Sequence, residues 1–333
     1  MSKKPQSQNL PRIDFAVGGQ AVIEGVMMRS PNFVTIAVRK PGGSITLKEE
    51  TYRSISARIR MLGIPLVRGV VNLFEMMIIG MRMVNFSAGQ AMEDEDQPME
   101  NIKTSGEKSR SLKNIGMILS FAFSLVFSLG LSLFLFKFLP LWITDYLSKT
   151  FTVLNENYLY YNFVDGMIKT TFFVVYIALL GLMPSLHRVF QYHGAEHKSI
   201  YTYEKGLPLN IENARNMTRF HPRCGTSFIL VVFLISIFIY TFVPRQPDFW
   251  SNFATRVAFL PIVAGVAYEV LRWSAKYAEH ALVKIITLPG LLFQRITTQE
   301  PTDDQLEVAL SALRKALELE EQKLEMVPVV DVH

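Results

Sequence analysis

Cysteine is nearly absent from this sequence: Cys224 is the only one in 333 residues, so no disulfide can form within the chain. Residues 1–14 are polar and basic, and they lack the short apolar core of a secretory signal. No basic run is interleaved with aromatic residues, and the net charge is only +5, so we expect no nucleic-acid partner. A single thiol suits a reducing compartment.

Charge is also scarce within several long apolar runs, and half of all residues are hydrophobic. A helix needs about 20 apolar residues to cross the ~30 Å hydrocarbon core of a bilayer. The runs therefore predict an α-helical membrane protein with about four transmembrane helices, at 115–136, 167–186, 226–243 and 253–273. A fifth or re-entrant segment is the alternative.

Lysine and arginine are unevenly distributed between these predicted helices. Sixteen precede the first helix, two lie between the first and second, six lie between the second and third, and one follows the third. Short loops rich in these residues stay in the cytoplasm. We therefore expect a multi-pass protein of the cell (inner) membrane, with both termini and the loop 187–225 in the cytoplasm.

Composition divides the chain into five segments. They are a β-rich cytosolic unit (1–58), an amphipathic interfacial helix (59–90), a polar linker (91–114), a transmembrane bundle that carries the loop 187–225 (115–295), and a C-terminal cytosolic helix and tail (296–333).

The N-terminal segment has the pattern of a β-hairpin. Residues 33–39 are rich in β-branched side chains, and a Pro-Gly-Gly turn separates them from a second such run at 44–47. Glu24 and Arg29 are charges in an apolar setting. Either they pair within the β unit, or Glu24 reaches the metal region or a partner.

The segment 59–90 is apolar except along one helical face. Arg68, Asn72, Glu75 and Arg82 follow spacings of four, three and seven, which places them together. This pattern favours a helix in the membrane interface, and a further span is the weaker interpretation.

Three charges fall in the last predicted span. Arg256 and Arg272 lie near its two ends, where long side chains can reach the headgroups. Glu269 either pairs with Arg272 at the membrane edge or reaches the metal region.

The C-terminal segment predicts one helix. Thr302 and Gln305 match a capping box, and a stripe of leucines follows at spacings of four, three and four: Leu306, Leu310, Leu313 and Leu317. The stripe should pack on this protein, on a second copy of it, or on a partner.

Histidines gather where the chain leaves the second predicted span. In His193-Gly-Ala-Glu196-His197 the two imidazoles are four residues apart, so a helix would present both to one ion. The H-x-x-E-H order inverts the H-E-x-x-H arrangement of zinc peptidases, in which the glutamate acts as a base. Glu196 is therefore the candidate catalytic residue.

His221 and Cys224 form a second element that could complete the metal site. Imidazoles and a thiolate suit zinc, with iron or cobalt as alternatives. Four bound side chains would make the site structural, whereas three would leave a place for catalysis. If no metal binds, the histidines serve as polar anchors or contact lipid phosphate.

Four motifs, in order, resemble the YqhQ family of bacterial multipass membrane proteins: 18–29, 65–69, 192–198 and 221–228. The resemblance covers about residues 15–310. It implies a membrane protein with a metal site at five residues: His193, Glu196, His197, His221 and Cys224. It supplies no reaction.

Two functions follow as expectations. The first is a zinc-dependent hydrolase at the cytoplasmic face of the membrane, acting on a membrane-associated peptide or lipid. The second is a non-catalytic scaffold or accessory factor of a membrane-protein biogenesis or assembly complex, with a structural metal. The expected partners are the lipid bilayer and a membrane protein complex, or a second copy through the C-terminal helix.

Overall fold

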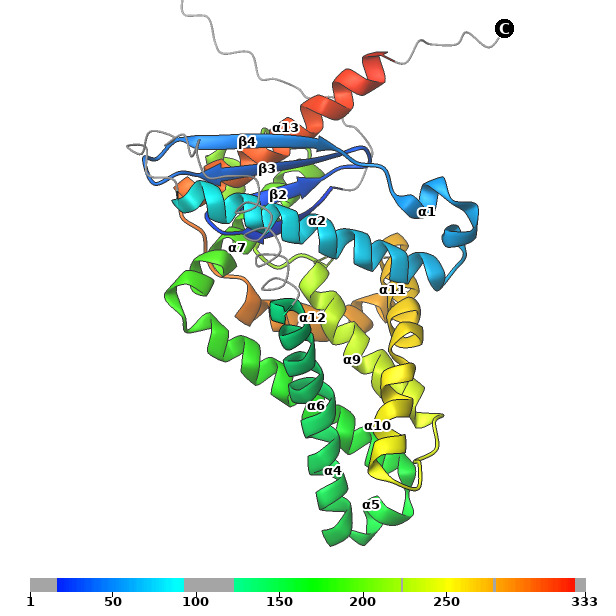
Figure 1. Ribbon diagram of the computed structural model, residues 1–333. Helices are drawn as coiled ribbons and strands as arrows, with labels where there is room; N and C mark the ends of the chain where they lie inside the picture. The colour runs from blue at the N-terminus through cyan, green and yellow to red at the C-terminus, as the bar shows by residue number, and fades with distance from the viewer. Residues whose placement is uncertain (1–16, 93–122, 223, 278–279, 327–333) are drawn as a thin grey trace, which may run out of the picture. The chain divides into compact units, whose positions relative to one another are not determined.

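The structure is a computed structural model that describes residues 17–92, 123–222, 224–277 and 280–326. The chain is mostly helical with one β-sheet, and it divides into two compact units (Figure 1). Unit 1 comprises Met1–Asp94, Ile177–Val231 and Ala264–His333, and unit 2 comprises Glu95–Tyr176 and Val232–Val263. Each unit therefore joins segments that are distant in the sequence.

Unit 1 contains the predicted β structure as a four-stranded antiparallel sheet. Its strands follow one another in order: β1 (Gly18–Val22), β2 (Gly25–Arg29), β3 (Phe33–Arg39) and β4 (Ile45–Thr51). Arg39 pairs with Ile45 across the Pro-Gly-Gly turn, which confirms the predicted hairpin. Along β3, alternate side chains enter two different apolar clusters, so both faces of the sheet are covered.

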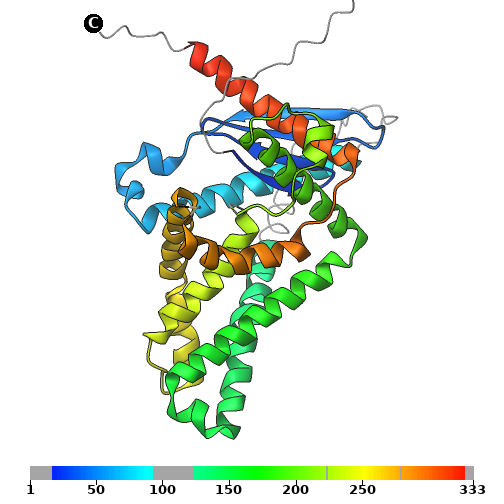
Figure 2. The same cartoon turned by 180° about the vertical axis from the view of Figure 1, so that it is seen from behind.

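Helices cover the two faces of this sheet. The helix α2 (Val67–Met92) contacts the face that carries Ile36, whereas α7 (Pro184–Glu204) and α13 (Asp303–Met326) contact the face that carries Ala37. Figures 1 and 2 show α2 and α13 on opposite sides of the strands. The sheet is thus the central layer of a helix–sheet–helix arrangement.

The C-terminal helix α13 packs on its own chain. The four leucines of the predicted stripe are at most 1% exposed and lie in the cluster with the sheet and α7. Gln305 Oε1 accepts a hydrogen bond from the backbone nitrogen of Thr302 at 2.9 Å, as a capping box requires. The stripe is therefore not a surface for a second copy.

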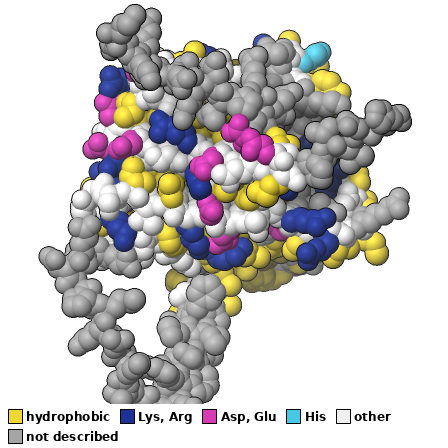
Figure 3. Space-filling model, turned by 90° about the horizontal axis from the view of Figure 1, so that it is seen from above, with side chains coloured by type: hydrophobic (Ala, Val, Ile, Leu, Met, Phe, Trp, Pro, Cys, Tyr) yellow, Lys and Arg dark blue, Asp and Glu magenta, His cyan; other side chains and the backbone are white. Residues whose placement is uncertain are grey.

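Ion pairs add to this contact at the surface. Arg39 of β3 pairs with Glu307 at 2.7 Å, and Lys315 pairs with Glu49 at 3.3 Å. On the face of the molecule shown in Figure 3, basic and acidic side chains are interspersed.

The polar residues of α2 form hydrogen bonds and ion pairs within the protein. Glu75 accepts hydrogen bonds from Ser54 Oγ (2.7 Å) and from the backbone nitrogen of Ile55 (2.6 Å). Arg68 pairs with both carboxylate oxygens of Glu269, at 2.7 and 2.5 Å. The expected Glu269–Arg272 pair is therefore wrong, as is a reach of Glu269 towards the metal region, because the carboxylate is engaged by α2.

Further labelled helices are either short or rich in apolar residues. They are α1 (Ile55–Arg58), η1 (Arg60–Gly63), η2 (Phe134–Phe138), α4 (Leu139–Thr150), α5 (Thr152–Glu156), α6 (Tyr158–Gly181), α8 (Ile211–Arg215), α9 (Gly225–Thr241), α10 (Phe249–Ala258), α11 (Leu260–Lys276) and α12 (Ala281–Thr297).

Among the described residues, three helical stretches are long and apolar enough to cross a membrane: Phe123–Thr150, Tyr158–Gly181 and Phe249–Ser274. A fourth apolar stretch, Ile229–Thr241, is shorter. The first helix continues to Thr150 rather than ending at 136, and the second begins nine residues before the predicted 167. The linker 93–114 and the start of the first predicted span lie outside the described residues.

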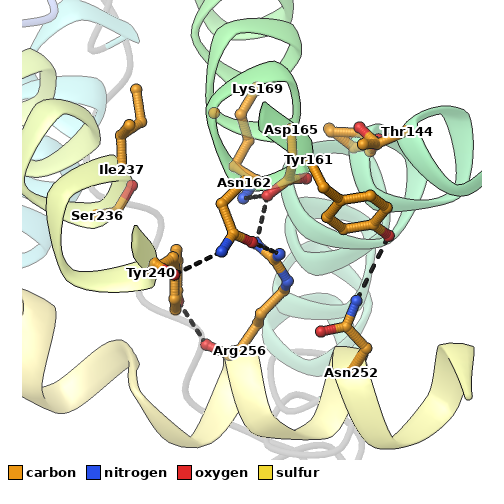
Figure 4. A network of polar contacts seen from close by, with 12 residues as sticks. Thr144, Tyr161, Asn162, Asp165, Lys169, Ser236, Ile237, Tyr240, Asn252 and Arg256 are labelled. Atoms are coloured by element: carbon orange, nitrogen blue, oxygen red, sulfur yellow. Dashed lines mark hydrogen bonds and ion pairs between the residues drawn. The ribbon is translucent and has the colours of Figure 1, made fainter. Parts of the chain in front are cut away.

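A buried charge network lies in the part of the second helix that precedes the predicted start. Asp165 was expected in a loop, but its Oδ2 accepts hydrogen bonds from Lys169 Nζ one turn later and from Arg256 Nη1 of α10, both at 2.5 Å (Figure 4). All three residues are at most 4% exposed. Arg256 therefore does not extend towards headgroups as expected, because Asp165 holds it inside unit 2.

Neutral side chains extend this network to α9. Asn162 Nδ2 donates to the backbone carbonyl of Tyr240 at 2.6 Å, and the Tyr240 hydroxyl donates to the carbonyl of Arg256 at 2.7 Å (Figure 4). Helices α6, α9 and α10 are thus joined by polar contacts between apolar surfaces. These hydrogen bonds satisfy groups that would be costly to bury alone.

Candidate metal centre

The helix α7 carries the H-x-x-E-H motif in its middle. His193 and His197 lie one turn apart on the same face, with their ring centroids separated by 4.4 Å. Both are buried, at 7% and 1% exposure. The helical placement that the spacing predicted is therefore observed.

Cys224 joins these two histidines from the residue before α9. Its Sγ lies 3.1 Å from His193 Nε2. One potential ligand atom from each of His193, His197 and Cys224 lies within 4.8 Å of the other two. A nucleophilic thiol and two imidazoles thus meet at one buried point of unit 1, although 27 residues separate His197 from Cys224 in the sequence.

Backbone carbonyls fix how the two imidazoles face this point. His193 Nδ1 lies 2.7 Å from the carbonyl oxygen of Thr297, and His197 Nδ1 lies 2.5 Å from that of Arg219. Because a carbonyl only accepts, each Nδ1 carries a proton, which leaves Nε2 as the ring nitrogen that a metal would bind. Metal-binding histidines are commonly oriented in this way by a partner of the second ring nitrogen.

An unpartnered atom supports the fit to a metal. His197 Nε2 is buried and has no hydrogen-bond partner within the described part of the chain. A buried nitrogen with a lone pair and no donor is costly unless something binds it. Two imidazole nitrogens and a thiol are soft to intermediate ligands, and this donor set fits zinc.

His221 is close to the group but does not belong to it. Its Nε2 lies 3.2 Å from Glu204 Oε2, and its ring centroid is 5.6 Å from that of His197. The structure therefore brings together three of the four predicted ligands. Three protein ligands leave a tetrahedral metal with one further position.

Glu196 is buried beside the group, on the same helix. Its Oε2 lies 4.0 Å from His193 Nε2. The strand β1 covers it so closely that a Cβ on Gly19 would lie 2.7 Å from Glu196 Cγ. Gly19, part of the first motif of the sequence, is thus a wall of the site.

Electrostatics favour an ion pair between His193 and Cys224. Burial alone lowers the pKa of His193, but the Cys224 thiolate and their hydrogen bond raise that pKa to about 9. Burial raises the pKa of the Cys224 thiol, and the His193 imidazolium lowers it by more, so it lies well below its usual range. Burial raises the pKa of Glu196, against the opposing effect of both imidazoles. A metal would therefore displace a proton from His193 and bind a thiolate already formed.

Gln294 of α12 holds the chain that leads to Cys224. Its side-chain Oε1 accepts from the backbone nitrogen of His221, and its Nε2 donates to the carbonyl of the same residue, both at 2.7 Å. Gln294 is fully buried. This two-point contact fixes the backbone three residues before Cys224, and nothing in the sequence pattern of α12 indicated it.

Gly194 lets a second segment approach the histidines. A Cβ at Gly194 would lie closer than 3.0 Å to the carbonyl oxygen of Gln299, which real Cβ atoms essentially never do. The backbone nitrogen of Gln299 also donates to the carbonyl of Phe190 at 2.8 Å. Residues 297–299 therefore lie directly on α7, which brings the Thr297 carbonyl to His193. The glycine that lowers helix propensity in the motif is required by this contact.

Basic residues of the loop tie the same segments together. Arg219 donates to the carbonyl of Thr298, Lys198 pairs with Glu300, and Arg215 pairs with Asp303. Arg215 and Arg219 are therefore engaged within the chain. Arg223 lies outside the described residues.

Glu24 reaches the helix of the site rather than Arg29. Its carboxylate pairs with Arg188 of α7 at 2.6 and 2.5 Å and accepts from the Tyr192 hydroxyl at 3.2 Å. The hydrogen bond from Arg188 lowers the pKa of Glu24. Glu24 has a φ of 50° in the β1–β2 turn, so a strained residue anchors the sheet one turn before His193.

Sequence comparison assigns the chain to a protein family. The chain belongs to the family described as "Protein of unknown function (DUF1385)", whose model matches residues 64–319. "Uncharacterized protein YqhQ" of Bacillus subtilis (strain 168) is 36% identical over 309 residues, which are 92% of this chain and 93% of that protein. The resemblance drawn from the four motifs is confirmed. No solved structure matches the chain.

Proposed function

We propose that the protein is a membrane-embedded, zinc-dependent hydrolase whose site faces the cytoplasm. The observation that carries the proposal is the group of His193, His197 and Cys224, with both Nδ1 atoms committed to carbonyls. Because His221 contacts Glu204 instead, the ligand set has three members and is open at one position. An open position is what a catalytic zinc needs.

Each residue of the site would have a separate role. His193, His197 and Cys224 would hold the metal, which acts as a Lewis acid on a substrate carbonyl or phosphoryl oxygen. Glu196, beside His193 and shielded by β1, would take a proton at its carboxylate and return it to the leaving group. Thr297 and the Arg219 carbonyl would keep the imidazoles oriented.

Placement in the membrane follows from charge and apolar length. The three long apolar helices would cross the cell (inner) membrane, with the shorter Ile229–Thr241 as a fourth crossing. The excess of Lys and Arg before Phe123 and within 187–225 would keep those segments, and the termini, in the cytoplasm. A substrate at such a site would be a lipid or a membrane-associated peptide.

A structural metal is the second candidate, and burial favours it. The three ligands are at most 7% exposed and come from α7 and from the segment before α9, so an ion would join two parts of unit 1. In this case the unit would be a scaffold for a membrane-protein complex. Glu196 would then only orient a ligand.

The metal content of the purified full-length protein tests both the catalytic and the structural candidate. We expect about one zinc per chain, lost in His197→Ala and Cys224→Ser and kept in His221→Ala and Glu196→Gln. Zinc should also protect Cys224 from alkylation until a chelator is added. If neither the wild type nor any variant holds metal, both candidates fail. If His221→Ala loses the ion, the site is closed and structural.

Complementation of a deletion strain separates the two remaining candidates. Under hydrolysis, Glu196→Gln keeps metal and fold but does not complement. Under scaffolding it complements as the wild type does.

A further inference from the structure

A groove of about 560 Å³ lies between α12 and the segment that precedes Cys224. One wall is a single face of α12, with residues at helical spacings: Lys284, Thr287, Leu288, Leu291, Leu292 and Arg295. The other wall is formed by Tyr201 of α7 with Phe220 and Pro222. The volume falls in the range of about 300–1,000 Å³ that small-molecule sites occupy.

The lining is apolar in the middle and cationic at both ends. Three leucines lie between Lys284 and Arg295, and no acidic side chain lines the groove among the described residues. The two cations are eleven positions apart, which is about 16 Å of helix. A ligand that matches this surface has a long apolar body and an anionic end.

Arg295 marks the end beside the metal centre. It follows Gln294, which holds the backbone of His221. The Tyr201 ring lies 4.5 Å from the His221 ring, whose centroid is 5.6 Å from that of His197. Arg295 makes no hydrogen bond or ion pair with the part of the chain that the structure describes, so its charge is available to a ligand.

Apolar side chains beside the groove connect it to lipid. Leu282 and Ile285 on α12 are 59% and 65% exposed, and Leu288 and Leu292 in the groove are each 50% exposed. A helix with such a face and two cations lies in a membrane interface. An acyl chain could enter from the bilayer without crossing water.

We propose that this groove binds the acyl chain of an anionic lipid, with the phosphate or carboxylate of the lipid at Arg295. Such lipids are then the substrate class of the hydrolytic site. This substrate class rests on the proposed function, whereas lipid binding in the groove does not. Charge complementarity selects an anionic amphiphile over a neutral one.

Photo-crosslinking tests the binding in the full-length protein. The protein is placed in phosphatidylcholine nanodiscs, stripped of metal with EDTA, and irradiated with palmitic acid that carries a diazirine on its chain. We expect label on residues 288–295 and on Phe220 or Pro222. Palmitate and lysophosphatidic acid, which supply a carboxylate and a phosphate, should each compete, and hexadecanol should not.

Variants within the groove give matched controls. Arg295→Gln should weaken probe binding about tenfold, as expected for loss of one charged hydrogen bond. Lys284→Gln removes the same charge from the same face three turns away and should change binding less than twofold. Leu291→Trp should fill the groove and abolish labelling without changing the thermal midpoint by more than a few degrees.

Three results would overturn the proposal. They are label spread over all exposed apolar helices, equal competition by hexadecanol, and an Arg295→Gln effect no larger than that of Lys284→Gln. Displacement by an acidic apolar peptide but not by lysophosphatidic acid would assign the groove to peptides instead. Because the protein is metal-free in this assay, its outcome is independent of the metal measurement.

Discussion

The carbonyl oxygen of Gln299 packs directly against the α-carbon of Gly194. Gly194 lies on α7 between His193 and His197 in the sequence. We expect Gly194→Ala to push residues 297–299 off the helix, which removes the Thr297 carbonyl from His193. Overpacking of this kind costs about 1–3 kcal/mol, and metal affinity should fall as well.

Gly89 supplies the matched control for that change. It also lies in a helix, α2, but a Cβ there would meet nothing within 4 Å. Gly89→Ala should stabilise the protein by up to about 1 kcal/mol through helix propensity. Chemical unfolding of the purified protein measures both, and equal effects of the two substitutions would contradict the role given to Gln299.

Gln294→Ala should loosen the chain that carries Cys224. It removes two hydrogen bonds to the His221 backbone and leaves the buried N–H without that acceptor, whereas the C=O still accepts from the backbone nitrogen of Cys224 at 3.3 Å; the cost should be about 1–3 kcal/mol. Zinc affinity should fall with stability. Gln322→Ala, on the exposed part of α13, should change the free energy of unfolding by less than about 0.5 kcal/mol. Unchanged zinc affinity in Gln294→Ala would show that His221 is held by other contacts.

Asp165→Asn should be among the most damaging single changes in unit 2. It leaves Lys169 and Arg256 buried without a carboxylate, and breaking a buried pair in this way costs about 3–5 kcal/mol. Glu156→Gln, an exposed carboxylate in the same unit, should be neutral. Thermal unfolding in detergent compares them, and a near-native midpoint for Asp165→Asn would mean that the network contributes little.

Stability should depend on pH through Glu24. Its folded-state pKa is lowered by Arg188, so its contribution is present above the unfolded value of about 4.5 and is lost as pH falls through the folded value. Arg188 is half exposed, which limits this contribution to about 1 kcal/mol or less.

The comparison of wild type with Glu24→Gln measures that contribution. The difference in unfolding free energy should be constant from pH 7 to about 5 and should shrink towards pH 3. Arg188→Gln should remove the same pH dependence. Parallel curves for wild type and Glu24→Gln over this whole range would rule the ion pair out as its source.

Local patterns in the sequence predicted what depends on local spacing. The β-hairpin, the capping box, the leucine stripe and the joint placement of His193 and His197 on one helical face all follow from periods of two or about 3.6 residues. The meeting of Cys224 with these histidines was also expected, because few other residues in the chain could serve a soft metal.

Long-range polar contacts could not be predicted in the same way. The partners of Glu24, Glu269 and Arg256 are 164, 201 and 91 residues away, so proximity in sequence suggested the wrong pairs for the first two. Orienting groups such as the Thr297 carbonyl carry no sequence signal, because every residue has a carbonyl. His221 was assigned to the metal from its residue type, its spacing from Cys224 and the family resemblance, none of which indicates that its Nε2 contacts Glu204.

The helix α13 is synthesised long after the sheet of residues 18–51, one face of which it covers. Its Glu320 accepts a hydrogen bond from Ser30, 290 residues earlier. Until α13 has been synthesised, the part of that face which it covers therefore stays exposed to chaperones or to other chains. Nascent chains that stall before Leu306 should accumulate as aggregates or degradation substrates, because the leucine stripe that closes this face is then missing.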